Sequence, residues 1–396
     1  MADAVILDLP GLQTLIDVLW TRGHHVLGPV QRDSALVLAE IDTVADLPRG
    51  VGDRQEPGAY RTRDRGDEAL FGFAATAQAA KPVLFPPDEL LWTGARTDTA
   101  DVTAQQAMDT GKVALLGVRG CDLAAIGIQD TILAGRAAID VHYTERRSAA
   151  FLIAVTCGTP AGTCFCASMG TGPKPGAGAD LTLTELLDDA GHRFLVEPGT
   201  PAGAEVLADV PGAQATAADL AAAAAVVTDA TATMGRHLPT EGLRDLLYAS
   251  AESPHWEDVA QRCLACTNCT LVCPTCFCTS VEDVSDLSGD IDERHRVWDS
   301  CFTMEYSQLH GGAVRTSTSA RYRQWLTHKL ASWTDQFGMS GCVGCGRCVT
   351  WCPAAIDLTA EVGALRDEAA HRGADPRAAG GGPHPGAAAV PTPPEH

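Results

Sequence analysis

The sequence predicts an α+β protein, in which a mixed α/β N-terminal domain precedes a smaller helical domain. Two short apolar segments in the first half, 113–118 and 151–156, have the composition of buried strands, and a helical pattern follows the first. In the second half, apolar residues recur at helical spacing over 240–247 and 322–333. One cysteine pattern also occurs twice there. These observations separate a sheet-containing body from a helical, cysteine-rich region.

Each element of the N-terminal domain is predicted from its local pattern. The expected elements are, in chain order, a helix at 12–20 and strands at 35–41, 113–118 and 151–156. Gly23 suits the end of the helix. Asp122 is expected to cap a helix that runs to Ile132, and the last strand ends directly before Cys157. The pattern of strand, loop and helix favours an α/β arrangement.

The second domain is predicted from its helical segments. Thr240 begins one of them, Ser253-Pro254 offers a cap and a first-turn proline to the next, and the segment 322–333 ends near Gly338. We therefore place a mixed α/β domain at 1–235 and an α-helical domain at 236–360. The remainder, 361–396, is rich in alanine, glycine and proline and is expected to be disordered.

Length and charge limit the class of protein. A chain of 396 residues is expected to form two or three domains. It has 29 lysine and arginine residues against 50 aspartate and glutamate residues, a net charge of −21 that argues against a nucleic-acid partner. The start has no basic segment followed by an apolar run, and the longest apolar run, 149–157, is too short to span a membrane. We expect a cytoplasmic protein with no membrane partner.

Eight of the 15 cysteines form two runs with the pattern C-x2-C-x2-C-x3-C-P. This is the bacterial ferredoxin pattern, whose thiolates hold a 4Fe–4S cluster. Three cysteines wind around one cluster, and the fourth usually points to the other. The ligands predicted for cluster 1 are Cys263, Cys266, Cys269 and Cys352. Those predicted for cluster 2 are Cys342, Cys345, Cys348 and Cys273.

The alternative for these runs is zinc, but zinc sites usually take two ligand pairs that lie far apart in the chain. The first cysteines of the two runs are 79 residues apart, a longer gap than in a compact bacterial ferredoxin. The gap reads as helical sequence, which favours an α-helical ferredoxin-like domain with an insertion. Gly344 and Gly346 let backbone N–H groups approach the sulfurs, which would raise the cluster potential. Arg347 would act in the same direction, or is simply a surface arginine.

Seven further cysteines are grouped rather than scattered. Thr-Cys-Phe-Cys occurs at 163–166 and again at 275–278. We hypothesise a third metal site, an additional Fe–S cluster, that takes its ligands from this pool. The first choice is Cys157, Cys164, Cys276 and Cys301, with Cys121, Cys166 and Cys278 as further candidates. The alternative is that these thiols are buried as small hydrophobic groups. The glycine-rich stretch 169–178 does not complete G-x-G-x-x-G, so a loop fits better than a nucleotide site.

Several segments together resemble a known family. They are Pro57–Arg61, Gly117–Ala125, Thr163–Pro173, Trp298–Phe302 and Tyr322–Lys329, with the two cysteine runs. The chain, over about 12–358, resembles the beta subunits of sulfhydrogenase-type soluble NiFe hydrogenases and the A subunit of anaerobic sulfite reductase. It departs from the expected pattern at Gly120, where proline would precede Cys-Asp.

The resemblance implies an electron-transfer subunit without catalytic residues of its own. Such a subunit connects a flavin-bearing gamma-type subunit, which exchanges electrons with NAD(P)H, to a terminal partner. That partner is the NiFe pair of subunits in the hydrogenases and a sirohaem subunit in the sulfite reductase, and we favour the hydrogenase. Two alternatives remain: a self-sufficient flavin-dependent oxidoreductase, and a structural module in which metal only stabilises the fold.

Overall fold

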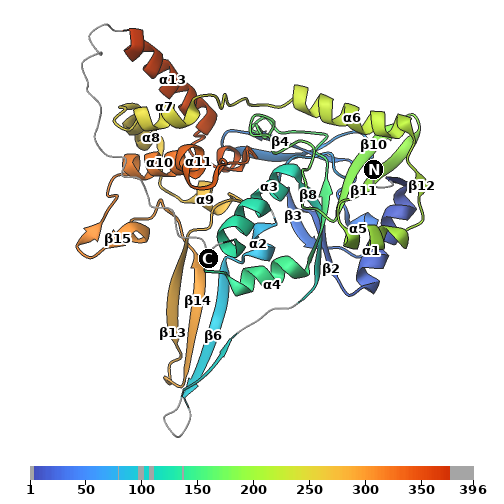
Figure 1. Ribbon diagram of the computed structural model, residues 1–396, viewed down its shortest axis with the longest axis horizontal. Coiled ribbons are helices and arrows are strands. Elements are labelled where there is room, and N and C mark those ends of the chain that lie inside the picture. Colours follow the sequence, from blue (N-terminus) through green and yellow to red (C-terminus); the bar gives the residue numbers. More distant parts are fainter. Residues whose placement is uncertain (1–3, 79, 97–101, 107–110, 136–137, 375–396) are drawn as a thin grey trace, which may run out of the picture.

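A mixed eight-stranded sheet forms the frame of the N-terminal part (Figure 1). The computed structural model describes residues 4–78, 80–96, 102–106, 111–135 and 138–374. In spatial order the strands are β12 (Ala213–Gln214), β1 (Val5–Leu7), β11 (Gly191–Pro198), β10 (Leu181–Asp188), β9 (Ala150–Val155), β8 (Val113–Arg119), β2 (His25–Arg32) and β3 (Ala35–Glu40). The central strands β2, β8, β9 and β10 run parallel. Their carboxyl ends therefore meet at one edge of the sheet.

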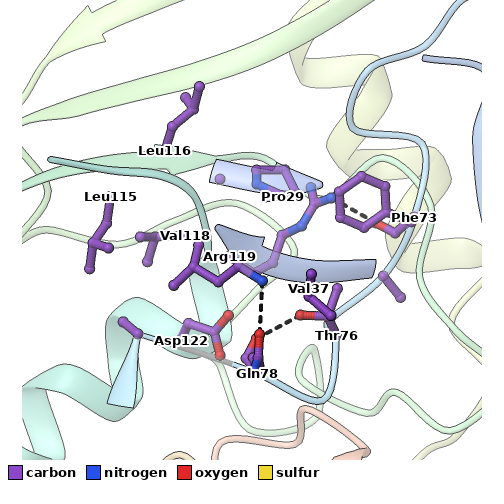
Figure 2. Close-up of a pocket in the computed structure, with 14 residues that line it drawn as sticks. Pro29, Val37, Phe73, Thr76, Gln78, Leu115, Leu116, Val118, Arg119 and Asp122 are labelled. Carbon is purple, nitrogen blue, oxygen red and sulfur yellow. Dashed lines mark hydrogen bonds between the residues drawn. The ribbon is translucent and has the colours of Figure 1, made fainter. Parts of the chain in front are cut away.

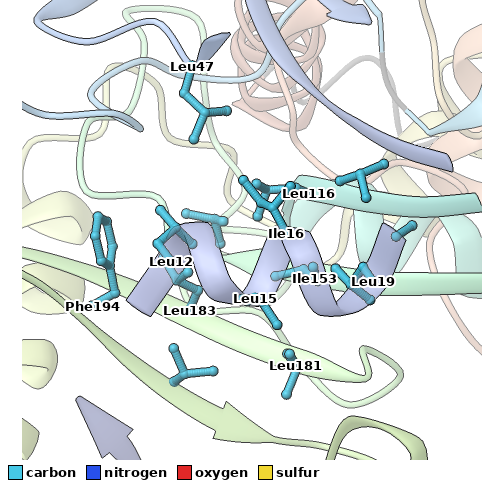
Figure 3. Close-up of a cluster of buried hydrophobic side chains, with 14 of the residues drawn as sticks. Leu12, Leu15, Ile16, Leu19, Leu47, Leu116, Ile153, Leu181, Leu183 and Phe194 are labelled. Atoms are coloured by element: carbon cyan, nitrogen blue, oxygen red, sulfur yellow. The ribbon is translucent and has the colours of Figure 1, made fainter. Parts of the chain in front are cut away.

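Helix α1 (Leu9–Thr21) covers one face of this sheet. It begins where the Asp8 carboxylate accepts a hydrogen bond from the Gly11 amide at 2.8 Å, and Gly23 follows it in the left-handed region. Figure 3 shows its apolar side packed on the strands. The buried side chains of this contact are Leu12, Leu15, Ile16, Leu19, Leu116, Ile153, Leu181, Leu183 and Phe194. The predicted first helix and the three predicted strands are confirmed.

The opposite face packs against short helices. They are α2 (Lys81–Leu84), α3 (Gly120–Gln129), its continuation η2 (Asp130–Ala134) and α4 (Val141–Ala149). The predicted cap by Asp122 is wrong, because α3 already begins at Gly120 and its cap position makes no side-chain hydrogen bond. Three further helices complete this part: η1 (Val44–Asp46), α5 (Pro201–Ala208) and α6 (Ala217–Ala232). The strands β4 (Val51–Glu56) and β5 (Ala59–Asp64) form a separate antiparallel hairpin.

A second sheet joins the two predicted domains. Its strands are β13 (Thr279–Ser285), β14 (Ile291–Trp298), β6 (Asp88–Arg96) and β7 (Val102–Gln106), and in Figure 1 it projects from the body as a ribbon. The hairpin β13–β14 lies between the cysteine runs, where the sequence was expected to be helical. That expectation is wrong for 279–298, because the hairpin alternates side chains around a turn at Asp286–Gly289 and gains a partner strand in β6.

The helical part follows the first sheet in the chain. Its helices are α7 (Leu243–Ala249), α8 (His255–Arg262), α9 (Asn268–Leu271), η3 (Glu305–Ser307), α10 (Thr318–Thr327), η4 (His328–Ser332), α11 (Trp333–Phe337), α12 (Arg347–Thr350) and α13 (Leu358–Ala374). A two-residue ladder pairs β15 (Gln308–Leu309) with β16 (Gly312–Ala313). The helices predicted from Thr240, Ser253 and 322–333 are confirmed within a few residues.

The predicted disordered tail needs a correction. Residues 361–374 belong to α13, whose Val362 and Leu365 are buried in the core of the helical part. Apolar side chains at helical spacing outweigh the alanine-rich composition there. The rest of that prediction, 375–396, lies outside the described residues. Among the described helices, none is long and apolar enough to cross a membrane.

Candidate metal centres

The cysteines of the first run surround a cavity together with one cysteine of the second run. Cys263 ends α8, Cys269 lies in α9, and Cys352 follows α12. The cavity lining contains Cys263, Cys266, Cys269 and Cys352, with Cys348 and the aromatic side chains Phe302, Tyr322 and Trp325. We call the first four cysteines the first centre. The structure thus brings together the four residues that the sequence assigned to cluster 1.

The second centre is defined as Cys273, Cys342, Cys345 and Cys348. Burial raises the pKa of the Cys342 thiol to about 12, and the nearby Cys273 and Cys345 act in the same direction. Burial also raises the pKa of Cys348, and the neighbouring thiols Cys342, Cys345 and Cys273 add to the effect. The fourth cysteine of the first run therefore lies among the first three of the second run. This is the arrangement predicted for cluster 2, and metal ligation by these thiols stays a prediction.

The two cysteine loops, 263–269 (first loop) and 342–348 (second loop), share one backbone conformation. Ala265 and Thr267 have φ of 49° and 67°, and the equivalent Gly344 and Gly346 have φ of 66° and 76°. The Ala265 amide donates to Cys263 Sγ at 3.4 Å, and the Gly344 amide donates to Cys342 Sγ at 3.5 Å. Such left-handed turns aim backbone N–H groups at an anionic group. Each loop therefore presents thiols and N–H donors in the same way.

The donor set fits 4Fe–4S clusters better than zinc. Each centre supplies four thiols, and backbone amides already contact cysteine sulfur in both loops. Within the described part of the chain, no three histidine, cysteine, aspartate or glutamate side chains are close enough to hold a single metal ion. Cys263, Cys266, Cys269 and Cys352 would hold one cluster, and Cys273, Cys342, Cys345 and Cys348 the other.

Lys329 contributes a buried charge that the sequence reasoning missed. It lies in the π-helical turn η4, its side chain is 6% exposed, and its Nζ donates to Cys273 Sγ at 3.2 Å and to Thr275 Oγ1 at 3.0 Å. A second buried ammonium, that of Lys81, lies 3.5 Å from the Cys273 carbonyl oxygen and over the Trp298 ring. Positive charge beside a ligand sulfur favours the reduced, more negative cluster. The sequence gives one indication of this role: Lys329 stands among the apolar residues that recur at helical spacing over 322–333.

Arg347 is an interior residue rather than a surface arginine. It is 1% exposed, and its Nη1 lies 2.6 Å from Asp122 Oδ1. Its Nε also donates to the Thr76 carbonyl at 2.5 Å. Both members of the ion pair are buried, so breaking it would leave a charge without compensation. The pair fastens the second loop to the start of α3.

One of the repeated Thr-Cys-Phe-Cys segments contacts the second run, and the other contacts the residue directly before it. The Phe165 amide donates to the Gly344 carbonyl at 2.9 Å, and the Thr275 hydroxyl donates to the Gly341 carbonyl at 2.9 Å. A Cβ built at Gly346 would lie 2.5 Å from the Thr163 carbonyl oxygen. The glycines of the second loop are therefore required by close packing as well as by their φ angles.

The predicted third site does not form from its first-choice residues. Cys157 and Cys164 belong to a buried group in the N-terminal part that also contains Cys121 and Cys166. The pKa of the Cys276 thiol is raised mainly by its neighbour Cys273, and the pKa of the Cys301 thiol mainly by its neighbour Cys278. The combination of Cys157, Cys164, Cys276 and Cys301 is corrected on this ground, because its members are divided between two groups. The two tetrapeptides contact different residues in and directly before the second run, which separates their cysteines.

A small cavity lies in the N-terminal part. It measures about 40 Å³, and its lining includes Pro29, Phe73, Thr76, Arg119 and Asp122 (Figure 2). A single water needs roughly 10–15 Å³, so this cavity accommodates a few waters rather than a flavin. Figure 2 also shows the Arg119 side chain reaching towards Phe73, whose carbonyl oxygen it contacts at 2.7 Å.

Comparison with known proteins agrees with this geometry. The 4Fe-4S dicluster domain family matches residues 262–356, a range that contains all eight cysteines of the two runs. The chain is also similar to the sulfhydrogenase 2 subunit beta of Pyrococcus furiosus, with 28% identity over 342 residues, 84% of this chain and 90% of the relative. No solved structure matches. The expected resemblance to sulfhydrogenase beta subunits is confirmed, and the findings support an iron–sulfur electron-transfer role.

Proposed function

We propose that this chain, as a relative of sulfhydrogenase beta subunits, is the electron-transfer subunit of a multisubunit hydrogenase. It relays electrons between an NAD(P)H-linked flavoprotein subunit and a NiFe hydrogenase. The observation that carries the proposal is the crossed arrangement of the two cysteine runs, in which each run supplies one thiol to the other centre. Such crossing places two 4Fe–4S clusters close together, as electron relay requires.

The bound clusters would supply reversible one-electron transfer, and the side chains of this chain control access and charge. Around the second centre, burial of Val343, Cys345 and Val349 excludes water. Around the first centre, Cys266 is exposed and Leu264 is 67% exposed. We therefore assign electron exchange with a partner to the first centre, and onward transfer within the complex to the second.

A groove beside the first centre supports partner contact there. It measures about 600 Å³, and Arg32, Tyr60, Arg61 and Trp351 line it next to Cys352. Trp351 stacks on Tyr60 with ring centres 5.1 Å apart. The lining also contains Asp33, so Arg32 and Arg61 leave the groove with a small positive excess, which would favour an acidic partner surface.

Anaerobic co-purification of the tagged full-length chain from its native host tests the proposal. We expect a flavoprotein subunit and a nickel-containing large subunit to be recovered with it. Recovery of a sirohaem protein in place of nickel would assign the relay to an anaerobic sulfite reductase. Flavin retained by the isolated chain, with NAD(P)H oxidation, would overturn the proposal in favour of a self-sufficient oxidoreductase. Metal that cannot be reduced reversibly would leave only a structural role.

A further inference from the structure

We propose that Cys121, Cys157, Cys164 and Cys166 hold a third iron–sulfur cluster, next to the second centre and inside the N-terminal domain. This deepens the proposed electron-transfer function and rests on it. The four thiols come from three places in the fold. Cys121 lies at the start of α3, directly after β8, and Cys157 follows β9. Because β8 and β9 are parallel neighbours, both cysteines lie at the same edge of the sheet.

The other two cysteines belong to the loop that crosses this edge. Cys164 and Cys166 lie at 4% and 6% exposure, and both interact electrostatically with Cys157. Cys121 packs in one buried group with Cys166 and Cys345. The loop returns to the strand end, where the Cys157 amide donates to the Pro173 carbonyl at 3.1 Å. Four buried thiols thus converge from β8, β9 and one loop.

Buried cysteines often serve as small hydrophobic groups, but the surroundings of this group are charged. Arg119 is 3% exposed, and its guanidinium donates to the carbonyl oxygens of Phe71, Phe73 and Thr156. Among the described residues its Nε has no hydrogen-bond partner, and the buried Asp53 carboxyl group interacts with it electrostatically. Burial raises the pKa of the Cys157 thiol, and the positive charge of Arg119 lowers it. An anionic cluster held by four thiolates would add negative charge beside this buried guanidinium.

The backbone around these thiols approaches them closely. A Cβ built at Gly172 would lie 2.9 Å from Cys166 Sγ, and one built at Gly344 would lie 2.7 Å from the Phe165 backbone. The thiol of Cys164 also lies 3.7 Å from the carbonyl oxygen of Cys345, a residue of the second centre. Transfer of one electron from the cluster of the second centre to the third cluster would oxidise the former by one electron and reduce the latter by one electron. The relay would extend from the exposed first loop into the α/β body.

Iron and acid-labile sulfide are measured in the full-length chain after anaerobic purification. Three 4Fe–4S clusters require roughly 12 iron atoms per chain, against roughly 8 for two. We expect Cys166→Ala and Cys157→Ala to lose about four iron atoms each. The matched control is Cys278→Ala, which changes the corresponding position of the other Thr-Cys-Phe-Cys segment and should keep the full iron content. Iron equal to two clusters in the wild-type chain, or unchanged iron in both N-terminal variants, overturns the proposal.

Electron paramagnetic resonance of the same samples separates this proposal from the proposed function. The signals of the first and second centres should persist in Cys166→Ala, which also shows that the variant is folded. If these two signals are absent from the wild-type chain, the proposed electron-transfer function fails as well. If they are present and a third is absent, only the third cluster is refuted.

Discussion

The two cysteine loops have one backbone conformation in two different surroundings. Both loops turn through left-handed residues at the same two positions. In the first loop those residues are the half-buried Ala265 and Thr267, and in the second they are Gly344 and Gly346, against the Thr-Cys-Phe-Cys segment at 163–166. The comparison teaches that the conformation belongs to the cluster-binding motif, whereas glycine is demanded by the neighbouring backbone.

The second loop is also the one that the fold secures with buried charge. Arg347 reaches Asp122 in the N-terminal part, and Lys329 reaches Cys273 from η4. The first loop is bordered instead by exposed side chains such as Leu264. We conclude that the second centre is protected and electrostatically tuned, whereas the first is accessible. The following predictions test this difference.

The largest expected effect comes from breaking the buried ion pair. Asp122→Ala leaves Arg347 buried and uncompensated, which should lower the free energy of unfolding by about 3–5 kcal/mol. The matched control is Asp283→Ala, which removes the exposed pair with Arg294 and should cost about 0–1 kcal/mol. Thermal unfolding under anaerobic conditions measures both. Equal effects of the two variants would contradict the assignment of the second loop as the anchored one.

Gly346→Ala should have the next largest effect. The residue has a φ of 76°, which costs about 1–3 kcal/mol for a residue with a side chain, and the new Cβ would meet the Thr163 carbonyl at 2.5 Å. The variant should have a lower free energy of unfolding and should also bind less iron at the second centre. Thr267→Gly in the first loop is the reverse control: it relieves the same left-handed strain, so it should not lower stability. A tolerated Gly346→Ala would show that the close packing is not required.

Lys329→Met should lower the reduction potential of the second centre and leave the first unchanged. A hydrogen bond to a charged group contributes about 1.5–3 kcal/mol, which corresponds to a shift on the order of 60–130 mV for one electron. Redox titration followed by electron paramagnetic resonance measures it. Lys329→Arg keeps the positive charge and should retain most of the potential. A change in the reduction potential of the first centre alone would contradict the assignment of Lys329 to the second centre.

The smallest expected effect on stability is that of Leu264→Ala. The side chain is 67% exposed, so the free energy of unfolding should change by less than about 0.5 kcal/mol. The rate of electron exchange with the flavoprotein partner should nevertheless fall, because the side chain borders the exposed Cys266. Val281→Ala, an exposed change on β13, is the control for a general surface effect. An unchanged rate of electron exchange would show that the partner does not bind at the first loop.

The sequence could predict the parts of the site that depend on local spacing. The two runs, their crossed pairing and the strand β9 that precedes Cys157 each follow from a short pattern. The charges around the second centre could not be predicted, because Asp122 and Arg347 are 225 residues apart and meet only in the folded chain. The hairpin β13–β14 was missed for the same reason, since its partner strand β6 lies in the other half of the chain.

The most direct test of the relay is a redox titration of the isolated full-length chain, followed by electron paramagnetic resonance. The account predicts at least two reversible one-electron signals from 4Fe–4S clusters. Cys266→Ser should remove one of them and Cys345→Ser the other, because the two residues belong to different centres. Loss of both signals in Cys266→Ser with normal folding, or a chain that binds zinc and shows no reversible signal, would contradict the account.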